Sequence, residues 1–147
     1  MSDIAWRPLL EELVATRTIS SDDPALDCGN RPAVEALAAR LERVGFDCRI
    51  QALPDRDDKA NLIATKGGGA PGDGLALAGH IDTVPFDAEG WDSDPFVLTE
   101  RNDRLYGLGS TDMKGFLALA AEAASRVDAK QLARPLTLIV SADEECG

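Results

Sequence analysis

The sequence predicts an α/β fold in which helices on both faces cover a layered, mixed and mostly parallel sheet. Two stretches repeat apolar residues at helical spacing within the first 45 residues. The runs LALAGHIDTV and PLTLIV are nearly continuous apolar segments, as expected of strands buried on both faces. A helix-forming segment rich in alanine and leucine separates these two runs, which is the order of a layered α/β domain.

The first half of the chain is predicted to supply two helices and two strands. A first helix is indicated by Leu9, Leu10, Leu13 and Val14. The second begins after a capping Asn30, has Pro32 in its first turn and ends at Gly45. Strands are predicted for CRIQAL (48–53) and NLIATKG (61–67), with a turn in PDRDDKA between them and a short flexible connection over 67–74.

The second half is predicted to supply two buried strands, a hairpin and a helix. Residues 75–84 form the first strand, followed by an irregular loop over 85–96. Residues 97–109 are typical of a hairpin that turns at Asn102 and Asp103. A helix is expected over 113–129, and a last strand begins at Pro135 and ends in the acidic residues ADEE.

Composition narrows the class of protein. The formal net charge is −11 and the pI is near 4.4, which argues against nucleic-acid binding. No apolar run approaches the length of a membrane span, and the N-terminus lacks the pattern of a secretory signal. The three cysteines form no CxxC pair, so we expect reduced thiols in a cytoplasmic protein rather than a disulfide framework.

Three polar clusters stand where an apolar strand or a glycine-rich turn gives way to a loop. They are His80 with Asp82, Asp112 in GLGSTDMKG, and the group Asp143, Glu144 and Glu145. Ligands bind beyond the carboxyl ends of strands in open α/β sheets. One imidazole and several carboxylates are a ligand set for zinc, cobalt or manganese. Strand alternation would place Asp82 where it can orient the imidazole, and one of the two adjacent glutamates could act as a general base.

Each cluster also has a plainer interpretation. A single histidine in an apolar strand is more often structural than functional, and an acidic pair after a strand is usually a solvated loop. Asp112 could cap the following helix. A nucleotide site in YGLGSTDMKG is disfavoured, because neither GxGxxG nor a phosphate-binding loop is present and Asp112 would repel phosphate.

Taken together, LAGHIDTVPF, WDSDPF, LYGLGSTDMKGF and SADEE resemble the M20 family of zinc amidohydrolases and peptidases, whose catalytic domain is phosphorylase/hydrolase-like. The resemblance implies two divalent metal ions, zinc or alternatively cobalt. It implies that His80 binds one ion, that Asp82 orients His80, and that Asp112 bridges both ions, with a cis peptide bond to Met113. Glu144 would be the general base and Glu145 a ligand of the second ion.

Within the family, the chain is most similar to members that hydrolyse N2-acetyl-L-ornithine to L-ornithine and acetate, a step of arginine biosynthesis. The alternatives are hydrolysis of N-succinyl-diaminopimelate, another aminoacylase or peptidase activity, and a fragment without catalytic activity. The resemblance implies that residues 1–147 are the N-terminal portion of the catalytic domain. A further acidic ligand, a histidine ligand and a lid domain that mediates homodimerisation would lie outside this chain. The chain alone is therefore expected to bind zinc weakly and to have little activity.

Overall fold

The computed structural model describes residues 4–68 and 74–146. Its elements are helices α1 (Trp6–Ala15), α2 (Arg31–Arg43) and α3 (Lys114–Ser125), and strands β1 (Asp47–Leu53), β2 (Arg56–Lys66), β3 (Leu75–His80) and β6 (Leu136–Ser141). Strands β4 (Thr99–Arg101) and β5 (Arg104–Tyr106) form a separate hairpin, and η1 (Ala88–Gly90) and η2 (Ala129–Gln131) are single 3-10 turns. Residues 69–73 of the predicted connection lie outside the described residues.

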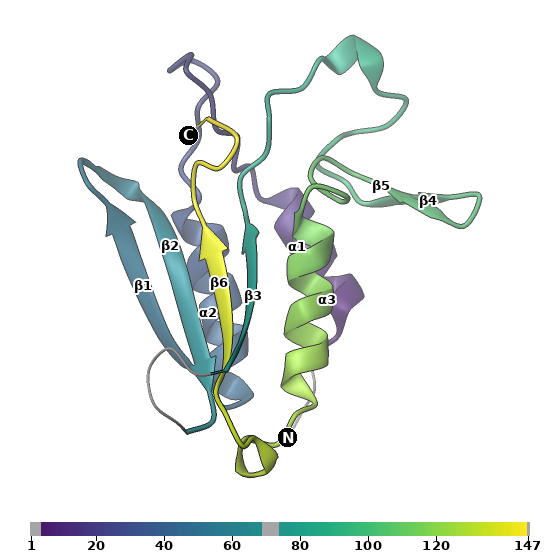
Figure 1. Ribbon diagram of the computed structural model, residues 1–147. Helices are drawn as coiled ribbons and strands as arrows, with labels where there is room; N and C mark the ends of the chain where they lie inside the picture. The colour runs from purple at the N-terminus through teal and green to yellow at the C-terminus, as the bar shows by residue number, and fades with distance from the viewer. Residues whose placement is uncertain (1–3, 69–73, 147) are drawn as a thin grey trace.

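The main sheet has the strand order β1-β2-β6-β3 and confirms the mixed α/β architecture (Figure 1). The expectation of a mostly parallel sheet was wrong for this part of the chain, because only β3 and β6 pair in parallel. Strand β1 turns tightly into β2, and β6 enters the sheet antiparallel to β2. A tight connection between neighbouring strands forces antiparallel pairing, which the apolar pattern of each strand alone does not reveal.

Among the described residues, the helices cover one face of this sheet rather than two. Leu62 and Val140 pair across β2 and β6 and are fully buried on the side of α2. Gly79 pairs with Val140, and a side chain at Gly79 would meet the first turn of α3. Helix α1 packs on α3 (Figure 1). On the other face Ala76 and Ala78 are exposed, so the apolar run of β3 does not mark burial on both faces within this chain.

Local features bear out most element predictions. The β4–β5 hairpin turns at Asn102 and Asp103. Both residues are left-handed, with φ of 53° and 57°, as a two-residue type I′ turn requires. Strand β2 begins inside the segment predicted to be a turn. Asn30 occupies the N-cap position of α2, as predicted. Its side chain, however, makes no capping hydrogen bond and instead pairs with the backbone N–H and C=O of Ala60, fixing the start of α2 against β2.

No helix in the described residues is long and apolar enough to cross a membrane.

Candidate metal centre

The candidate site lies where β3 and β6 end side by side. These strands run parallel, so their carboxyl ends meet at one edge, and His80 pairs with Ser141 at the last position. The ladder continues one step further through a hydrogen bond from the Ile81 N–H to the Ser141 carbonyl oxygen, 3.1 Å. This arrangement brings the loop after His80 against the turn that carries Glu144 and Glu145.

His80 is buried and faces carboxylates on both sides of its ring. Its Nε2 lies 3.0 Å from Asp112 Oδ1 and 3.9 Å from Glu144 Oε2. Its Nδ1 lies 3.1 Å from the backbone oxygen of Asp82 and 3.4 Å from Asp82 Oδ1. Burial lowers the pKa of the imidazole, but the hydrogen bond to Asp112 and the charge of Asp82 outweigh burial and raise the pKa of His80 overall.

Asp112 comes from the loop that enters α3. Its side chain is 74% exposed and reaches His80, and the peptide bond to Met113 is cis, as the family resemblance implied. Met113 is the N-cap of α3 and no side chain caps that helix end. The structure therefore places Asp112 at the His80 site rather than in the capping role that its position also allowed.

The last strand delivers two carboxylates to the same place. One ligand atom each of His80, Glu144 and Glu145 lie within 4.8 Å of one another. Burial raises the pKa of the Glu145 carboxyl, and the charges of Asp112, Asp82 and Glu144 add to this effect against the opposing influence of His80. Neighbouring carboxylates thus repel one another at this edge.

Asp82 contacts both His80 and the backbone of Glu145. It is 1% exposed, and its Oδ2 accepts a hydrogen bond of 3.0 Å from the Glu145 N–H. Its Oδ1 is buried without a hydrogen-bond partner in the part of the chain that the structure describes. Strand β3 ends at His80, so strand alternation does not place Asp82, and the irregular backbone after the strand turns its carboxylate towards His80.

These residues fit a divalent cation. An imidazole nitrogen and carboxylate oxygens at one edge are the donor set of zinc and related metals. Burial and the neighbouring carboxylates together raise the pKa of Glu145, and a cation bound between the carboxylates would relieve their repulsion. The unpartnered Asp82 Oδ1 beside His80 Nδ1 is placed to accept from the imidazole of a metal-ligating histidine.

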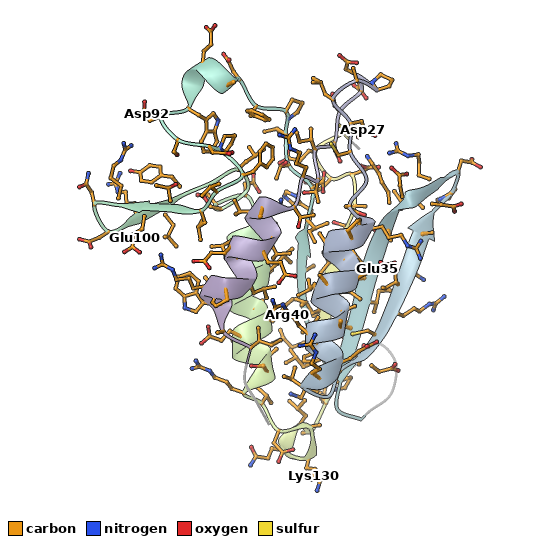
Figure 2. The ribbon with its side chains drawn as sticks, turned by 180° about the vertical axis from the view of Figure 1, so that it is seen from behind. Asp27, Glu35, Arg40, Asp92, Glu100 and Lys130 are labelled. Carbon is orange, nitrogen blue, oxygen red and sulfur yellow. The ribbon has the colours of Figure 1, made fainter. Side chains whose placement is uncertain are left out.

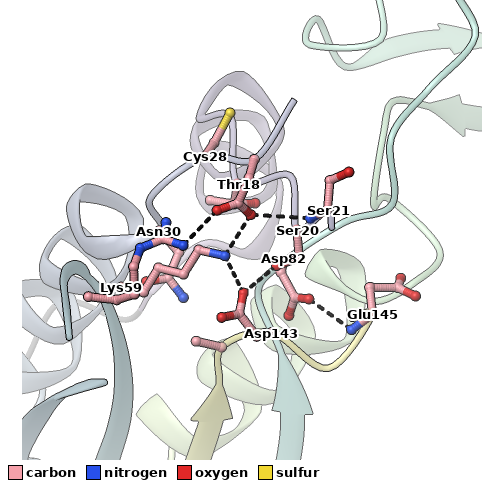
Figure 3. A network of polar contacts seen from close by, with 12 residues as sticks. Thr18, Ser20, Ser21, Cys28, Asn30, Lys59, Asp82, Asp143 and Glu145 are labelled. Carbon is pink, nitrogen blue, oxygen red and sulfur yellow. Dashed lines mark hydrogen bonds and ion pairs between the residues drawn. The ribbon is translucent and has the colours of Figure 1, made fainter. Parts of the chain in front are cut away.

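Asp143 lies outside this group, although the sequence placed it beside the glutamates. Its carboxylate contacts Lys59 Nζ and accepts a hydrogen bond of 2.6 Å from the Ser20 hydroxyl (Figure 3). Lys59 also donates to Asp27 Oδ1 at 2.7 Å. Burial lowers the pKa of Lys59, but its hydrogen bonds to Asp143 and Asp27 outweigh burial and raise the pKa overall.

Sequence reasoning missed three residues that support the site. Lys59 lies in a segment predicted to be a turn, and Asn61 accepts from the Ala142 N–H at 2.8 Å. Lys114 is 1% exposed and donates to the backbone oxygens of Leu13 and Thr16 at the end of α1. Burial lowers the pKa of Lys114 to about 8. No local signal marks these residues, because each acts through a partner distant in the sequence.

A hollow of about 380 Å³ adjoins the residue preceding Asp112. Its walls are Trp91, Arg104, Tyr106 and the backbone-rich segment 107–111. The loop after η1 and strand β5 therefore form a surface beside the candidate metal ligands that combines two aromatic rings with a guanidinium group.

Comparison with known proteins agrees with the family resemblance of the sequence. Residues 76–147 match the model of peptidase family M20/M25/M40. The chain is 47% identical over 137 residues to acetylornithine deacetylase of Photorhabdus laumondii, covering 93% of this chain and 35% of that protein. It is 48% identical over 133 residues to acetylornithine deacetylase of Pasteurella multocida, covering 90% of this chain and 34% of that protein. The chain thus spans about a third of the length of these curated relatives.

Solved structures share the fold. Human carnosine dipeptidase 1 superposes with a TM-score of 0.75 at 28% identity, covering 97% of this chain and 32% of that chain. The M20 family metallo-carboxypeptidase Sso-CP2 from Sulfolobus solfataricus superposes with a TM-score of 0.78 at 23% identity, covering 95% of this chain and 31% of that chain.

Proposed function

We propose, from the match of residues 76–147 to the model of peptidase family M20/M25/M40, that the chain is the N-terminal, metal-binding portion of a metal-dependent amidohydrolase of that family. The observation that carries the proposal is the convergence of His80, Asp112, Glu144 and Glu145 at one sheet edge. Four residues from three separate segments meet there, a density of ionisable groups that neither a structural histidine nor a solvated acidic loop requires.

We propose that two divalent ions, zinc or cobalt, are held here. His80 would bind one ion, Glu145 the other, and Asp112 would lie between them. Once bound, such ions polarise the amide carbonyl and acidify the attacking water. Asp82 contributes by holding the His80 ring from the Nδ1 side and the Glu145 backbone through its N–H.

Glu144 is the proposed general base. Its side chain is 60% exposed and lies 3.9 Å from His80 Nε2, so it stands beside the ligands and is open to an incoming substrate. It would take a proton from the attacking water and pass that proton to the leaving amine nitrogen. The geometry requirement for this role is hydrogen-bond reach to the water, which an exposed carboxylate at the rim of the ligand group can satisfy.

The proposed substrate is N2-acetyl-L-ornithine, giving L-ornithine and acetate. Identity of 47% over 93% of the chain to a protein named acetylornithine deacetylase supports this choice. The hollow of about 380 Å³ that Thr111 helps to line, next to Asp112, has a volume in the range of small-molecule sites. The family resemblance further leads us to propose a cytoplasmic homodimer for the complete protein, and little turnover by residues 1–147 alone.

The test uses the purified protein that contains this chain, loaded with zinc or cobalt. Release of ornithine from N2-acetyl-L-ornithine is compared with release of diaminopimelate from its N-succinyl form. Glu144→Gln should abolish the preferred activity while bound metal is retained, and Glu89→Gln, an exposed glutamate in η1, serves as the matched control. Preference for the succinyl substrate would replace the proposed substrate, and a fully active Glu144→Gln variant would contradict the proposed base.

A further inference from the structure

The turn that follows β6 carries both Glu144 and Glu145, and its backbone is held at each end by a side chain from another element. The Ala142 N–H donates to Asn61 Oδ1 of β2 at 2.8 Å. The Glu145 N–H donates to Asp82 Oδ2 at 3.0 Å. Between these two anchors the chain passes through Asp143, which is left-handed with φ of 56°. Aspartate is among the few residues other than glycine that adopt this conformation regularly, and the contacts of its carboxylate help to hold it here.

The carboxylate of Asp143 is held by an ionic contact with the buried Lys59 and by a hydrogen bond from Ser20. Lys59 is only 3% exposed, and its ammonium group contacts the carboxylate of Asp143 (Figure 3). It also contacts the carboxylate of Asp27. Asp27 in turn accepts from Arg56 Nη1 at 2.8 Å. Ser20 adds a neutral hydrogen bond to Asp143 at 2.6 Å. The ammonium group of Lys59 is buried and must be paired, and Asp143, which is 30% exposed, is one of its two carboxylate partners.

This network lies at the same end of the molecule as the candidate metal ligands. Figure 2 shows Asp27 at the end towards which β3 and β6 run, whereas Lys130 lies at the opposite end. Lys59 begins the part of β2 that continues to Asn61, the residue that anchors Ala142. One strand therefore supplies two of the contacts that fix the turn.

We propose that Lys59 is a positioning residue that orients Glu144 and Glu145. By anchoring Asp143 in the left-handed conformation, it sets the direction in which the next two side chains leave the backbone and turns them towards His80. The inference deepens the proposed function and rests on it, since positioning has a chemical consequence only if these carboxylates bind metal and act as a base. Mutation of a residue that orients metal ligands without binding the metal itself typically lowers metal affinity or activity 10–100-fold.

The chain provides a matched control for a purely structural role. Lys66 lies at the other end of the same strand, is 1% exposed, and donates to the backbone oxygens of Ala124 and Ser125 at the end of α3. Lys59→Met and Lys66→Met therefore each remove a buried ammonium group from β2. Only the first removes a contact to the turn that bears the glutamates.

The primary measurement needs no metal. Amide hydrogen exchange of Ala142 and Glu145 should become at least about 10-fold faster in Lys59→Met than in wild type, and should be unchanged in Lys66→Met. Lys59→Arg should restore slow exchange, because a guanidinium group retains the ionic contact. If Lys59→Met does not fold, Asp143→Asn replaces it, since this change weakens the same contact from its other side.

A second measurement uses the cobalt-loaded protein that contains this chain. Lys59→Met should alter the visible absorption bands of bound Co²⁺ and lower kcat about 10–100-fold with a smaller change in KM, whereas Lys66→Met should do neither. Unchanged exchange in Lys59→Met overturns the inference. Faster exchange with wild-type Co²⁺ bands and kcat also overturns it, because Lys59 would then only stabilise the turn. Failure of wild type to bind Co²⁺ contradicts the proposed function, and the exchange measurement still decides whether Lys59 fixes the turn.

Discussion

Replacement of Asp82 by alanine tests the proposed centre most directly, because Asp82 links its two halves. The carboxylate is 1% exposed. One oxygen accepts the Glu145 N–H at 3.0 Å, and the other lies 3.4 Å from His80 Nδ1. Asp82→Ala therefore removes both the acceptor of a backbone group beside one proposed ligand and the anion beside another.

The magnitude follows from these two losses. The Glu145 N–H is partly buried, so leaving it without an acceptor costs up to the roughly 1–3 kcal/mol of folding free energy that a buried N–H would cost. Loss of the carboxylate behind a ligating histidine costs about 10–100-fold in metal affinity or activity, or roughly 1.4–2.7 kcal/mol. Asp82→Asn separates the two effects, because its amide oxygen can still accept from Glu145 while the charge beside His80 is lost.

The assays are the midpoint of thermal unfolding, the metal bound per chain after dialysis, and kcat/KM for N2-acetyl-L-ornithine. Asp82→Ala should lower kcat/KM more than it lowers metal content, since it disturbs the ligands without removing one. Asp82→Asn should keep most of the stability and lose part of the activity. Activity and metal content within about twofold of wild type in Asp82→Ala would refute the reasoning, because a buried carboxylate in this position would then orient nothing.

Three further predictions concern packing and titration. Gly79→Ala places a Cβ 3.0 Å from Phe116 Cδ1 and 3.1 Å from Leu117 Cδ2 in α3, and should destabilise the fold by about 1–3 kcal/mol in urea titrations. Gly90→Ala, with nothing within 4 Å of the new Cβ, should be neutral. Burial raises the pKa of Asp27, but the hydrogen bond from Lys59 helps to lower it overall, so the ionised form stabilises the fold above the ordinary value of 3.8. That contribution is lost as the pH falls through the lowered pKa. The free energy of unfolding should therefore fall less between pH 4.5 and about pH 2.5 in Asp27→Asn than in wild type. Burial, with nearby carboxylates, raises the pKa of Cys48 from 9.0 to about 11. At pH 8, alkylation of Cys48 by iodoacetamide, followed by mass spectrometry, should therefore be about 100-fold slower in the folded chain than in urea. An equal rate in both states would contradict this prediction.

The elements were predictable where a short stretch carries its own signal. The helical spacing around Leu9 and Leu37 gave α1 and α2, and both residues are fully buried. Strand pairing was not predictable in the same way. The apolar runs of β3 and β6 favoured a mostly parallel sheet, yet β6 inserts between β2 and β3 and is antiparallel to β2. Alanines in β3 satisfy an apolar pattern without requiring cover, so the run also overstated burial.

The residues of the candidate site also differ in how far the sequence could predict them. His80, Asp112 and Glu145 could be named from the sequence because each follows a strand or a glycine-rich turn, and the topological rule for parallel strands brings such ends together. Asp82 and Asp143 were also visible in the sequence, but Lys59, which we propose to position the glutamates, was not. Lys59 and Asp143 are 84 positions apart, and a lysine in an acidic, turn-like segment has the same appearance whether it is solvated or buried in an ion pair. Burial decides between these states, and burial is a property of the assembled sheet rather than of any local pattern. The sequence therefore indicates which residues could bind a metal here, whereas their placement depends on long-range contacts that only the fold creates.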